Sequence, residues 1–211
     1  SDESLTFVAS DAHKLVRYKR LDVKPQQHAS FILPKKPASL LKAILGKDGA
    51  DVTIEFDDKN ALFTMENYNL VCRLVEGVYP NYNSVIPTSN PNTMTIDRLD
   101  FYNSLRRVAP FTNQASNLVK LTLKGNQLVV SAQDLDFSIS AFERINCQYD
   151  GQDMEIGFKS VFLIEILANI SATDIILSLS DPSRAGLLFP AVADNENEDV
   201  LMLLMPMMVS A

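Results

Sequence analysis

The chain has 211 residues, of which 46% are hydrophobic and 21% are charged, a composition typical of a globular protein and not of a disordered or disulfide-rich one. The formal net charge is −7, so only a local basic face could bind nucleic acid. The longest apolar run, 200–209, contains a proline and is shorter than the ~20 residues that a membrane span needs. We expect a cytoplasmic protein with no membrane partner and with reduced thiols at Cys72 and Cys147.

The first third of the chain predicts one amphipathic helix among short strands. Residues 30–33 predict a strand, residues 37–45 a helix, and residues 52–56, 61–65 and 70–75 three further strands separated by turns. Residues 5–20 predict two more strands, which resemble the end of another such unit. Because the chain also lacks an initiator Met, we expect it to begin inside a repeated module.

The same order of elements occurs twice more. The second copy comprises 93–96, a helix from about 99 to 108, 118–123, 127–131 and 137–142, and the third comprises 153–156, a helix over 160–170, 174–179, 186–189 and 200–205. The opening strands end at Leu33, Ile96 and Ile156, which are 63 and 60 residues apart. We therefore expect an α+β fold of repeated βαβββ modules. Residues 87–91 are the best linker signal, which predicts an incomplete domain over 1–88 and a complete one over 89–211.

Four short motifs accompany the repeat: Ser10–Leu15, Glu76–Tyr82 followed by Val85–Pro87, Met154–Phe158 and Leu203–Met207. Together they resemble the bacterial replicative sliding clamp family, the beta subunit of DNA polymerase III, over essentially the whole chain. The resemblance implies the DNA clamp fold, with antiparallel sheets outside and helices on the inner face of a ring. In that family a homodimer of three-domain chains encloses duplex DNA, and this chain would correspond to the last domain and most of the middle one.

The last motif is apolar and rich in methionine. From the residues alone, Leu203–Met207 fit either a buried final strand or an adaptable binding surface, because methionine side chains are flexible and polarizable. The resemblance implies a hydrophobic cleft that receives a short peptide, commonly Gln followed by Leu and Phe. The peptides belong to the DNA polymerase III alpha subunit, the clamp loader and other clamp-binding proteins.

Carried over residue by residue, the expected peptide-binding residues come from three motifs. They are Ser10, Ala12, His13, Lys14, Leu15, Pro80, Tyr82, Ser84, Val85, Leu203, Leu204, Met205, Pro206 and Met207. Ala12 stands where the family usually has Gly, Lys14 where it usually has Arg, and Ser84 where Arg is frequent. These departures concern the polar rim of the cleft and not its apolar floor.

Basic residues occur on or beside all three predicted helices, at Lys35, Lys36, Lys42, Arg98, Arg106, Arg107 and Lys159. From the residues alone, a solvated helix face is the simpler interpretation, and contact with DNA is the other. The resemblance implies that these residues face DNA and contact phosphates without reading sequence. It also implies a dimer contact at Pro110 and Phe111.

An enzyme would need a nucleophile with a base, or a cluster of metal ligands. The chain has two histidines, and the alternation of side chains along a strand would separate Ser10 from His13. We therefore expect no catalytic residue, metal or cofactor, and a processivity factor that tethers replication and repair proteins to DNA. Two alternatives stay open: a peptide-binding scaffold that does not encircle DNA, and a hydrolase that uses Ser10 and His13.

Overall fold

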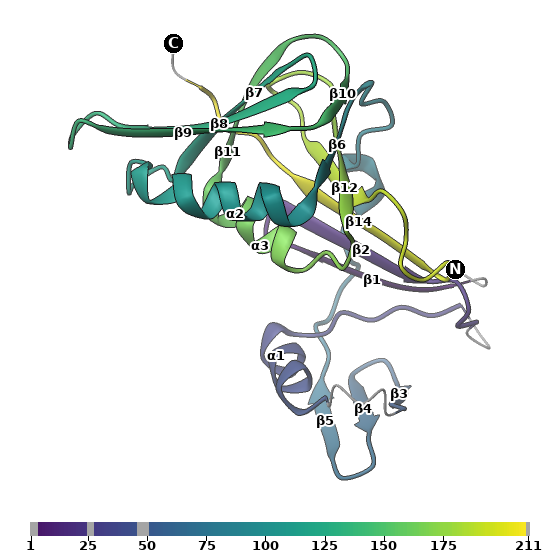
Figure 1. The fold of residues 1–211 in the computed structure, drawn as a ribbon. Coiled ribbons are helices and arrows are strands. Elements are labelled where there is room, and N and C mark those ends of the chain that lie inside the picture. The colour runs from purple at the N-terminus through teal and green to yellow at the C-terminus, as the bar shows by residue number, and fades with distance from the viewer. Residues whose placement is uncertain (1–3, 25–27, 46–50, 210–211) are drawn as a thin grey trace. The chain divides into compact units, whose positions relative to one another are not determined.

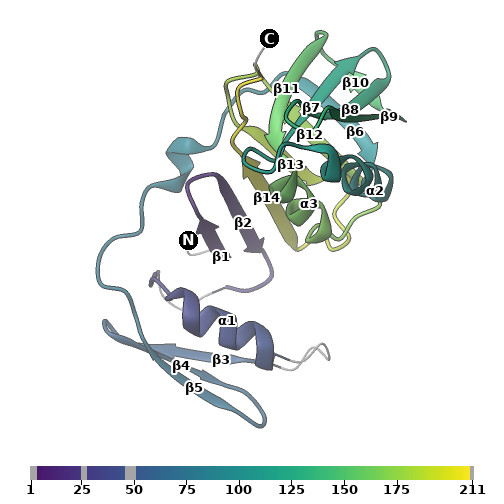
Figure 2. The ribbon, with the colours of Figure 1, turned by 90° about the vertical axis from the view of Figure 1, so that its left-hand side faces the viewer.

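The structure is a computed structural model that describes residues 4–24, 28–45 and 51–209. The chain divides into two compact units, a larger one of residues 1–26 and 84–211 and a smaller one of residues 27–83. Figures 1 and 2 show the elements of each unit from two directions.

The larger unit contains most of the strands and two of the three α-helices found among the described residues. In chain order its elements are β1 (Leu5–Ser10), β2 (Lys14–Arg20), β6 (Asn92–Asp97), α2 (Arg98–Val108), η2 (Ala109–Phe111), β7 (Leu118–Lys124), β8 (Gln127–Asp134), β9 (Ile139–Asn146), β10 (Gln148–Asp150), β11 (Met154–Lys159), α3 (Ser160–Ala168), β12 (Asp174–Leu179), β13 (Gly186–Pro190) and β14 (Glu198–Leu204). The smaller unit contains α1 (Lys35–Ile44), β3 (Thr53–Phe56), β4 (Asn60–Thr64) and β5 (Asn69–Arg73), and the short helix η1 (Tyr82–Val85) follows at the boundary.

Two antiparallel sheets and a pair of helices build the larger unit. The described strands form a seven-stranded sheet in the order β1-β2-β14-β13-β12-β6-β10 and a four-stranded sheet in the order β11-β7-β8-β9. Helices α2 and α3 lie side by side (Figures 1 and 2), and their buried side chains, among them Phe101 and Leu163, join one core with both sheets. In the part of the chain that the structure describes, no helix is long and apolar enough to cross a membrane.

Each module of the larger unit contributes its first strand to the sheet of the other module. Strand β6 of the second copy pairs with β12 of the third, with Ile96 opposite Ile175. Strand β11 of the third copy pairs with β7 of the second, with Ile156 opposite Leu121. Neither module completes its sheet alone, so the two fold as one domain. The prediction of an α+β fold of repeated βαβββ modules is confirmed.

Local sequence explains how these elements begin and turn. The side chains of β6 alternate between buried and half-buried, as expected for a strand with one face toward the core and the other toward the surface. Asp97 then caps α2, because its carboxylate accepts a hydrogen bond from the backbone N–H of Asp100 at 2.8 Å. The turn between β7 and β8 places Gly125 at a φ of 55°, which glycine adopts without a steric penalty.

The smaller unit has its own core. Its strands form an antiparallel sheet in the order β3-β4-β5, and Leu41 of α1 packs with Phe63, Cys72 and Leu74. The predicted strand over 30–33 is absent from the described structure. The backbone N–H of Val75 donates a hydrogen bond to the Ile32 carbonyl and so anchors this segment. A strand needs a regular series of such bonds, and the segment is not assigned as one.

The β1–β2 hairpin groups with the larger unit and not with the rest of residues 1–88. The reason is that β2 pairs along its whole length with β14, so that Leu15 lies opposite Leu203. Arg17 and Asp199 add an ion pair of 3.0 Å across the same two strands. The compact units therefore differ from the predicted domains over 1–88 and 89–211, whose boundary stays a prediction.

We predict that Leu163→Ala lowers the free energy of unfolding of the larger unit by about 2–5 kcal/mol, because it leaves a cavity between α2, α3 and the sheets. Urea titration followed by hydrogen exchange of peptides from α2 and α3 measures this unit separately from the smaller one. Leu99→Ala on the exposed side of α2 is the control and should change the value by less than about 0.5 kcal/mol. Equal effects of the two substitutions would contradict this packing.

Candidate functional site

The turn between β1 and β2 is held by its own polar groups. The Asp11 carboxylate accepts hydrogen bonds from the backbone N–H groups of His13 at 3.1 Å and Lys14 at 2.9 Å. The Ser10 hydroxyl donates to the Lys14 carbonyl at 3.0 Å and accepts from the Ala12 N–H at 3.3 Å. Ala12 has a φ of 72°, a left-handed conformation that costs an L-residue about 1–2 kcal/mol. The hydrogen bonds of Asp11 and Ser10 maintain this strained turn without the glycine that would relieve it.

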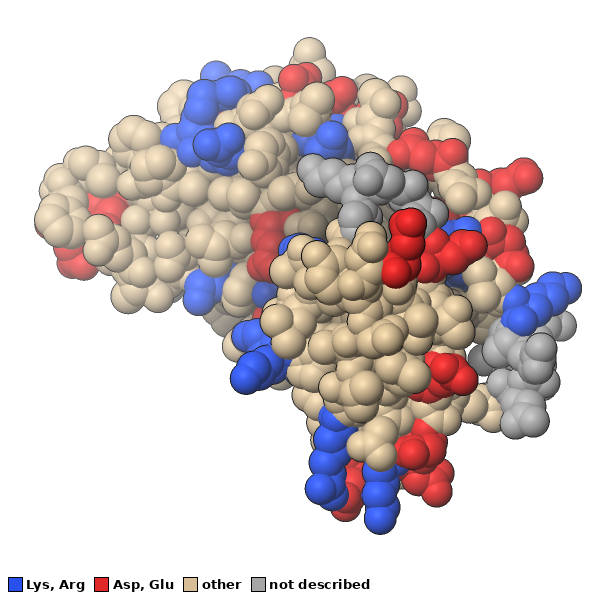
Figure 3. Space-filling model, turned by 90° about the horizontal axis from the view of Figure 1, so that it is seen from below, with Lys and Arg blue, Asp and Glu red and all other residues tan. Residues whose placement is uncertain are grey.

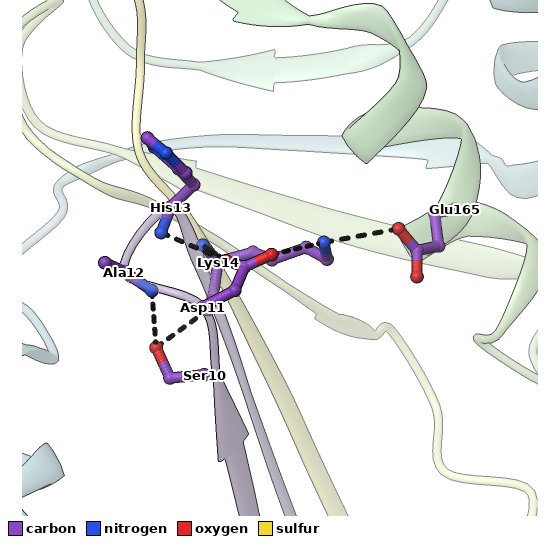
Figure 4. A network of polar contacts seen from close by, with 6 residues as sticks. All are labelled: Ser10, Asp11, Ala12, His13, Lys14 and Glu165. Carbon is purple, nitrogen blue, oxygen red and sulfur yellow. Dashed lines mark hydrogen bonds and ion pairs between the residues drawn. The ribbon is translucent and has the colours of Figure 1, made fainter. Parts of the chain in front are cut away.

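Lys14 connects the turn to helix α3. Its ammonium lies 2.7 Å from the Asp11 carboxylate and 3.3 Å from that of Glu165 (Figure 4). The same nitrogen lies 4.2 Å from the centre of the Phe162 ring. Phe162 and Glu165 are three residues apart on α3, so both reach the same side of the helix.

Two further side chains share the Phe162 ring. The His13 imidazole stacks on it with 5.9 Å between ring centres, and the Lys159 ammonium lies 5.2 Å from its centre. The rim of the candidate site is therefore an aromatic ring surrounded by two ammonium groups and an imidazole. The ammonium groups interact with the ring through its negative faces.

The Asp11 carboxyl has a strongly shifted pKa. Burial alone would raise its pKa, but hydrogen bonds from the Lys14 side chain and from the backbone of Lys14 and His13 outweigh burial and lower the pKa to about 2. The same hydrogen bond to Asp11, supported by the one to Glu165, raises the pKa of Lys14. The charges of Asp11 and Lys14 are thus maintained at neutral pH.

The segment after β14 runs beside this turn. The Met205 N–H donates to the His13 carbonyl at 2.9 Å, and the Met207 N–H donates to the Gly157 carbonyl of β11 at 2.8 Å. A Cβ atom at Gly157 would lie 2.8 Å from the Met207 carbonyl oxygen, so only glycine permits this approach. The C-terminal segment is consequently fixed between the β1–β2 turn and β11.

The apolar side chains of these motifs differ in exposure. Leu15 and Leu203 are buried opposite each other, and Leu204, on the other face of β14, belongs to the main core. Met205 is 42% exposed and Val85 is 57% exposed. The side chains of Pro206 and Met207 are half-buried. The accessible apolar surface therefore comes from Met205 and Val85 more than from the leucines.

The structure brings Ser10–Leu15 and Leu203–Met207 together within the larger unit. Ser84 and Val85 also belong to this unit, whereas Pro80 and Tyr82 belong to the smaller one. Phe162 and Glu165 were not identified from the sequence. A signal for Glu165 was present, because it is the single charged residue in the apolar helix 160–168.

The basic residues expected to face DNA differ in their surroundings. Lys35, Lys36 and Lys42 on α1 and Arg106 on α2 are exposed. Arg107 forms a two-pronged ion pair with Glu143 at 2.5 and 2.6 Å. On the face drawn in Figure 3, the blue side chains lie in small groups that have uncharged or red side chains beside them.

Arg98 and Lys159 have other contacts. The Arg98 guanidinium is half-buried and donates to the carbonyls of Ala172 at 2.8 Å and Leu167 at 3.1 Å, which ties the start of α2 to the end of α3. Lys159 lies beside Phe162, in the rim of the candidate site. Arg98 is therefore committed to internal contacts, and the ammonium of Lys159 belongs to the cluster around His13.

Pro110 and Phe111 form the short helix η2 after α2. Pro110 is exposed, and Phe111 is half-buried against the core. Helix η2 contacts β9, the edge strand of the four-stranded sheet, where Phe142 and, just before the strand, Phe137 are exposed. An open strand edge with exposed aromatic rings is typical of a surface that another chain covers.

The described residues hold no group of three or more potential metal-ligating side chains. The Ser10 hydroxyl donates a hydrogen bond to the Lys14 carbonyl, and His13 points away from Ser10 (Figure 4). The His13 ring stacks instead on Phe162. Ser10 and His13 are thus not arranged as a nucleophile and its base. The arrangement can bind a partner through exposed apolar atoms and a charged rim.

Comparison with protein families matches residues 83–208 to the C-terminal domain of the DNA polymerase III beta subunit and residues 1–81 to its central domain. The chain is 25% identical over 213 residues to the beta sliding clamp of Caulobacter vibrioides, covering 99% of this chain and 55% of the relative. It is 26% identical over 206 residues to that of Pseudomonas aeruginosa, covering 97% and 54%. The chain thus spans about half the length of the curated relatives it matches.

Comparison with solved structures also finds sliding clamps. The DNA polymerase sliding clamp of Pseudomonas aeruginosa superposes with a TM-score of 0.91 at 25% identity, covering 99% of this chain and 57% of that one. The DNA polymerase III subunit beta sliding clamp of Bartonella birtlesii superposes with a TM-score of 0.89 at 29% identity, covering 98% and 58%.

We predict that the Asp11 carboxyl titrates at about pH 2 in a carboxyl ¹³C NMR experiment, and at a higher pH in Lys14→Met, which lacks the side-chain donor. Because the folded pKa lies below the ordinary value of ~3.9, ionised Asp11 favours the folded state above about pH 4. That contribution is lost as the pH falls toward 2. Asp57, whose pKa is lowered by its own turn, is the control and should not shift. An unchanged Asp11 midpoint in the variant would contradict the network.

Proposed function

The chain belongs to the DNA polymerase III beta-subunit family, and from this premise we propose that it is part of a sliding clamp that encircles duplex DNA and tethers replication and repair proteins to it. The observation that carries the proposal is the meeting of Ser10–Leu15 with Met205–Met207 beside Phe162. Tethering requires binding surfaces and no chemical step. We therefore propose a processivity factor that acts without catalytic residues, metal or cofactor.

The proposed peptide site lies at the end of β14. Met205 and Val85 offer exposed apolar atoms, and the His13 and Lys14 side chains form the adjoining polar rim. A short peptide with Gln, Leu and Phe anchors fits such a surface, because the thioether of Met205 can adapt to different partners. We propose the DNA polymerase III alpha subunit, the clamp loader and other clamp-binding proteins as the sources of such peptides. Short peptides should bind with micromolar affinity, since few anchors offset the ordering of a flexible chain.

The proposed DNA contacts are made by exposed cations of the helices. Lys35, Lys36, Lys42 and Arg106 are the candidates, because Arg98 is used internally and Arg107 is paired with Glu143. Such side chains neutralise phosphates without distinguishing bases. The small number of these exposed cations and the net charge of −7 support weak contacts within a ring that holds DNA by enclosure.

The proposed ring is a homodimer of the full-length protein. Pro110 and Phe111 lie beside the open edge of β9, and Phe142 is exposed on the other face of that strand. Pairing of the β9 edge with a strand of the other subunit would cover these rings and satisfy the backbone groups of the edge. The alternative is a scaffold that never encircles DNA. Such a scaffold forms no ring, so it would not need this edge for ring closure.

We predict that Met205→Asp weakens binding of a fluorescent peptide with Gln, Leu and Phe anchors at least tenfold, because it places an unpaired charge in an apolar contact. Fluorescence anisotropy measures the affinity. Val192→Asp, an exposed apolar residue in the β13–β14 connection at the other end of β14, is the control and should stay within about twofold. Unchanged affinity in Met205→Asp would place the peptide elsewhere.

We predict that the chain binds linear duplex DNA weakly, and that this binding falls steeply between low and physiological salt. Replacing Lys35, Lys36 and Lys42 by Ala should reduce the slope of log K against log salt by about 0.9 for each phosphate that the variant no longer neutralises. A charge-matched control replaces the strand residues Lys19, Lys120 and Lys124 and should leave the slope unchanged. Equal effects of the two triple variants would count against DNA binding through α1, and no binding at low salt would favour the scaffold.

A further inference from the structure

We propose that Glu165 is a positioning residue for the peptide site, which acts through Lys14 to hold the β1–β2 turn in the conformation that receives a peptide. This inference rests on the proposed peptide site and adds to it a residue that none of its three sequence motifs contains. Glu165 belongs to α3, and its contact with the turn is the ion pair of 3.3 Å with Lys14.

Helix α3 is a fixed reference for this contact. Leu163, Ile166 and Leu167 bury one side of the helix in the main core, so close packing sets the position of α3. Glu165 projects from the remaining side, next to Phe162, and its side chain is 58% exposed. A carboxylate with that much access to water could remain fully hydrated. Instead it is directed at the Lys14 ammonium, as Figure 4 shows.

The orientation of the turn depends on contacts with residues outside the turn. The hydrogen bonds of Ser10 and Asp11 determine its internal shape, but both residues belong to the turn and cannot fix its orientation toward the helix. The His13 carbonyl ties it to Met205 on the segment after β14, and Lys14 and His13 contact Phe162. Among the described residues, the Lys14–Glu165 pair is the ionic contact between turn and helix. It holds the Lys14 side chain against α3, next to His13, whose backbone carbonyl accepts the hydrogen bond from Met205.

An exposed ion pair contributes little to folding stability, because solvent screens the two charges. Its effect on peptide binding is larger, since a turn that is already oriented does not have to be ordered when the peptide binds. Without Glu165, the Lys14 ammonium keeps Asp11 and the Phe162 ring, but it loses the carboxylate on α3 that gives its side chain one direction. The expected consequence is weaker peptide binding by a protein of nearly unchanged stability.

The test uses Glu165→Gln, which keeps the size of the side chain and removes its charge. We expect a threefold to tenfold weaker affinity for the peptide with Gln, Leu and Phe anchors, and a thermal unfolding midpoint within about 2 °C of the unaltered chain. The matched control is Glu155→Gln. Glu155 is 53% exposed and pairs with Lys120 at 3.2 Å on the strands β11 and β7, so its replacement should leave the peptide affinity unchanged.

A double-mutant cycle with Lys14→Met separates positioning from direct contact. If Glu165 acts through Lys14, Glu165→Gln causes no further loss of affinity in the Lys14→Met background. An equal loss of affinity in both backgrounds, or unchanged affinity in Glu165→Gln alone, overturns the role of Glu165. Failure of the unaltered chain to bind the peptide would instead overturn the proposed peptide site itself.

Discussion

The pairing of β2 with β14 is the constraint on which the site depends. It joins residues as far apart in sequence as Arg17 and Asp199, and its register places Leu15 opposite Leu203. Because side chains alternate along a strand, a shift of one residue would send Leu15 to the other face of the sheet and move His13 away from Met205. The hydrogen bond between Met205 and His13 continues the pairing beyond the last strand residue.

The site combines a rigid support with adaptable side chains. The exchange of first strands between the two modules closes one core around α2 and α3, so that Phe162 and Glu165 project from a fixed helix. Met205 and Met207 sit on backbone held by hydrogen bonds to His13 and Gly157, and the unbranched Met205 side chain is 42% exposed, so it can adapt to a partner. Such a division suits a surface that accepts related peptides from different proteins.

The basic residues show why charge counting is a weak guide to DNA contacts. Arg98 and Arg107 have the residue type that binds phosphate, yet one donates to backbone carbonyls and the other pairs with Glu143. Lys159 lies beside the Phe162 ring, which His13 and Lys14 also contact. Hydrogen-bonded and paired cations have fewer free donors for a phosphate than hydrated ones.

The sequence by itself determined the modular fold. The repeat of strand, helix and three strands follows from hydrophobic periodicity, and the exchange of β6 and β11 is consistent with it, because local patterns specify local elements. The sequence also identified the turn 10–15 and the segment 203–207. Residues 30–33 show the limit of such patterns, since a strand requires a partner that its own residues do not supply.

Only the tertiary structure decided which side chains meet. The grouping of the β1–β2 hairpin with the larger unit depends on pairing with β14, which no local pattern contains. The burial of Leu204 in the core, the exposure of Met205 and the reach of Glu165 to Lys14 likewise depend on packing between distant segments. Composition and spacing report what each segment can form, whereas contacts across the fold are determined by the geometry of the sheets and helices together.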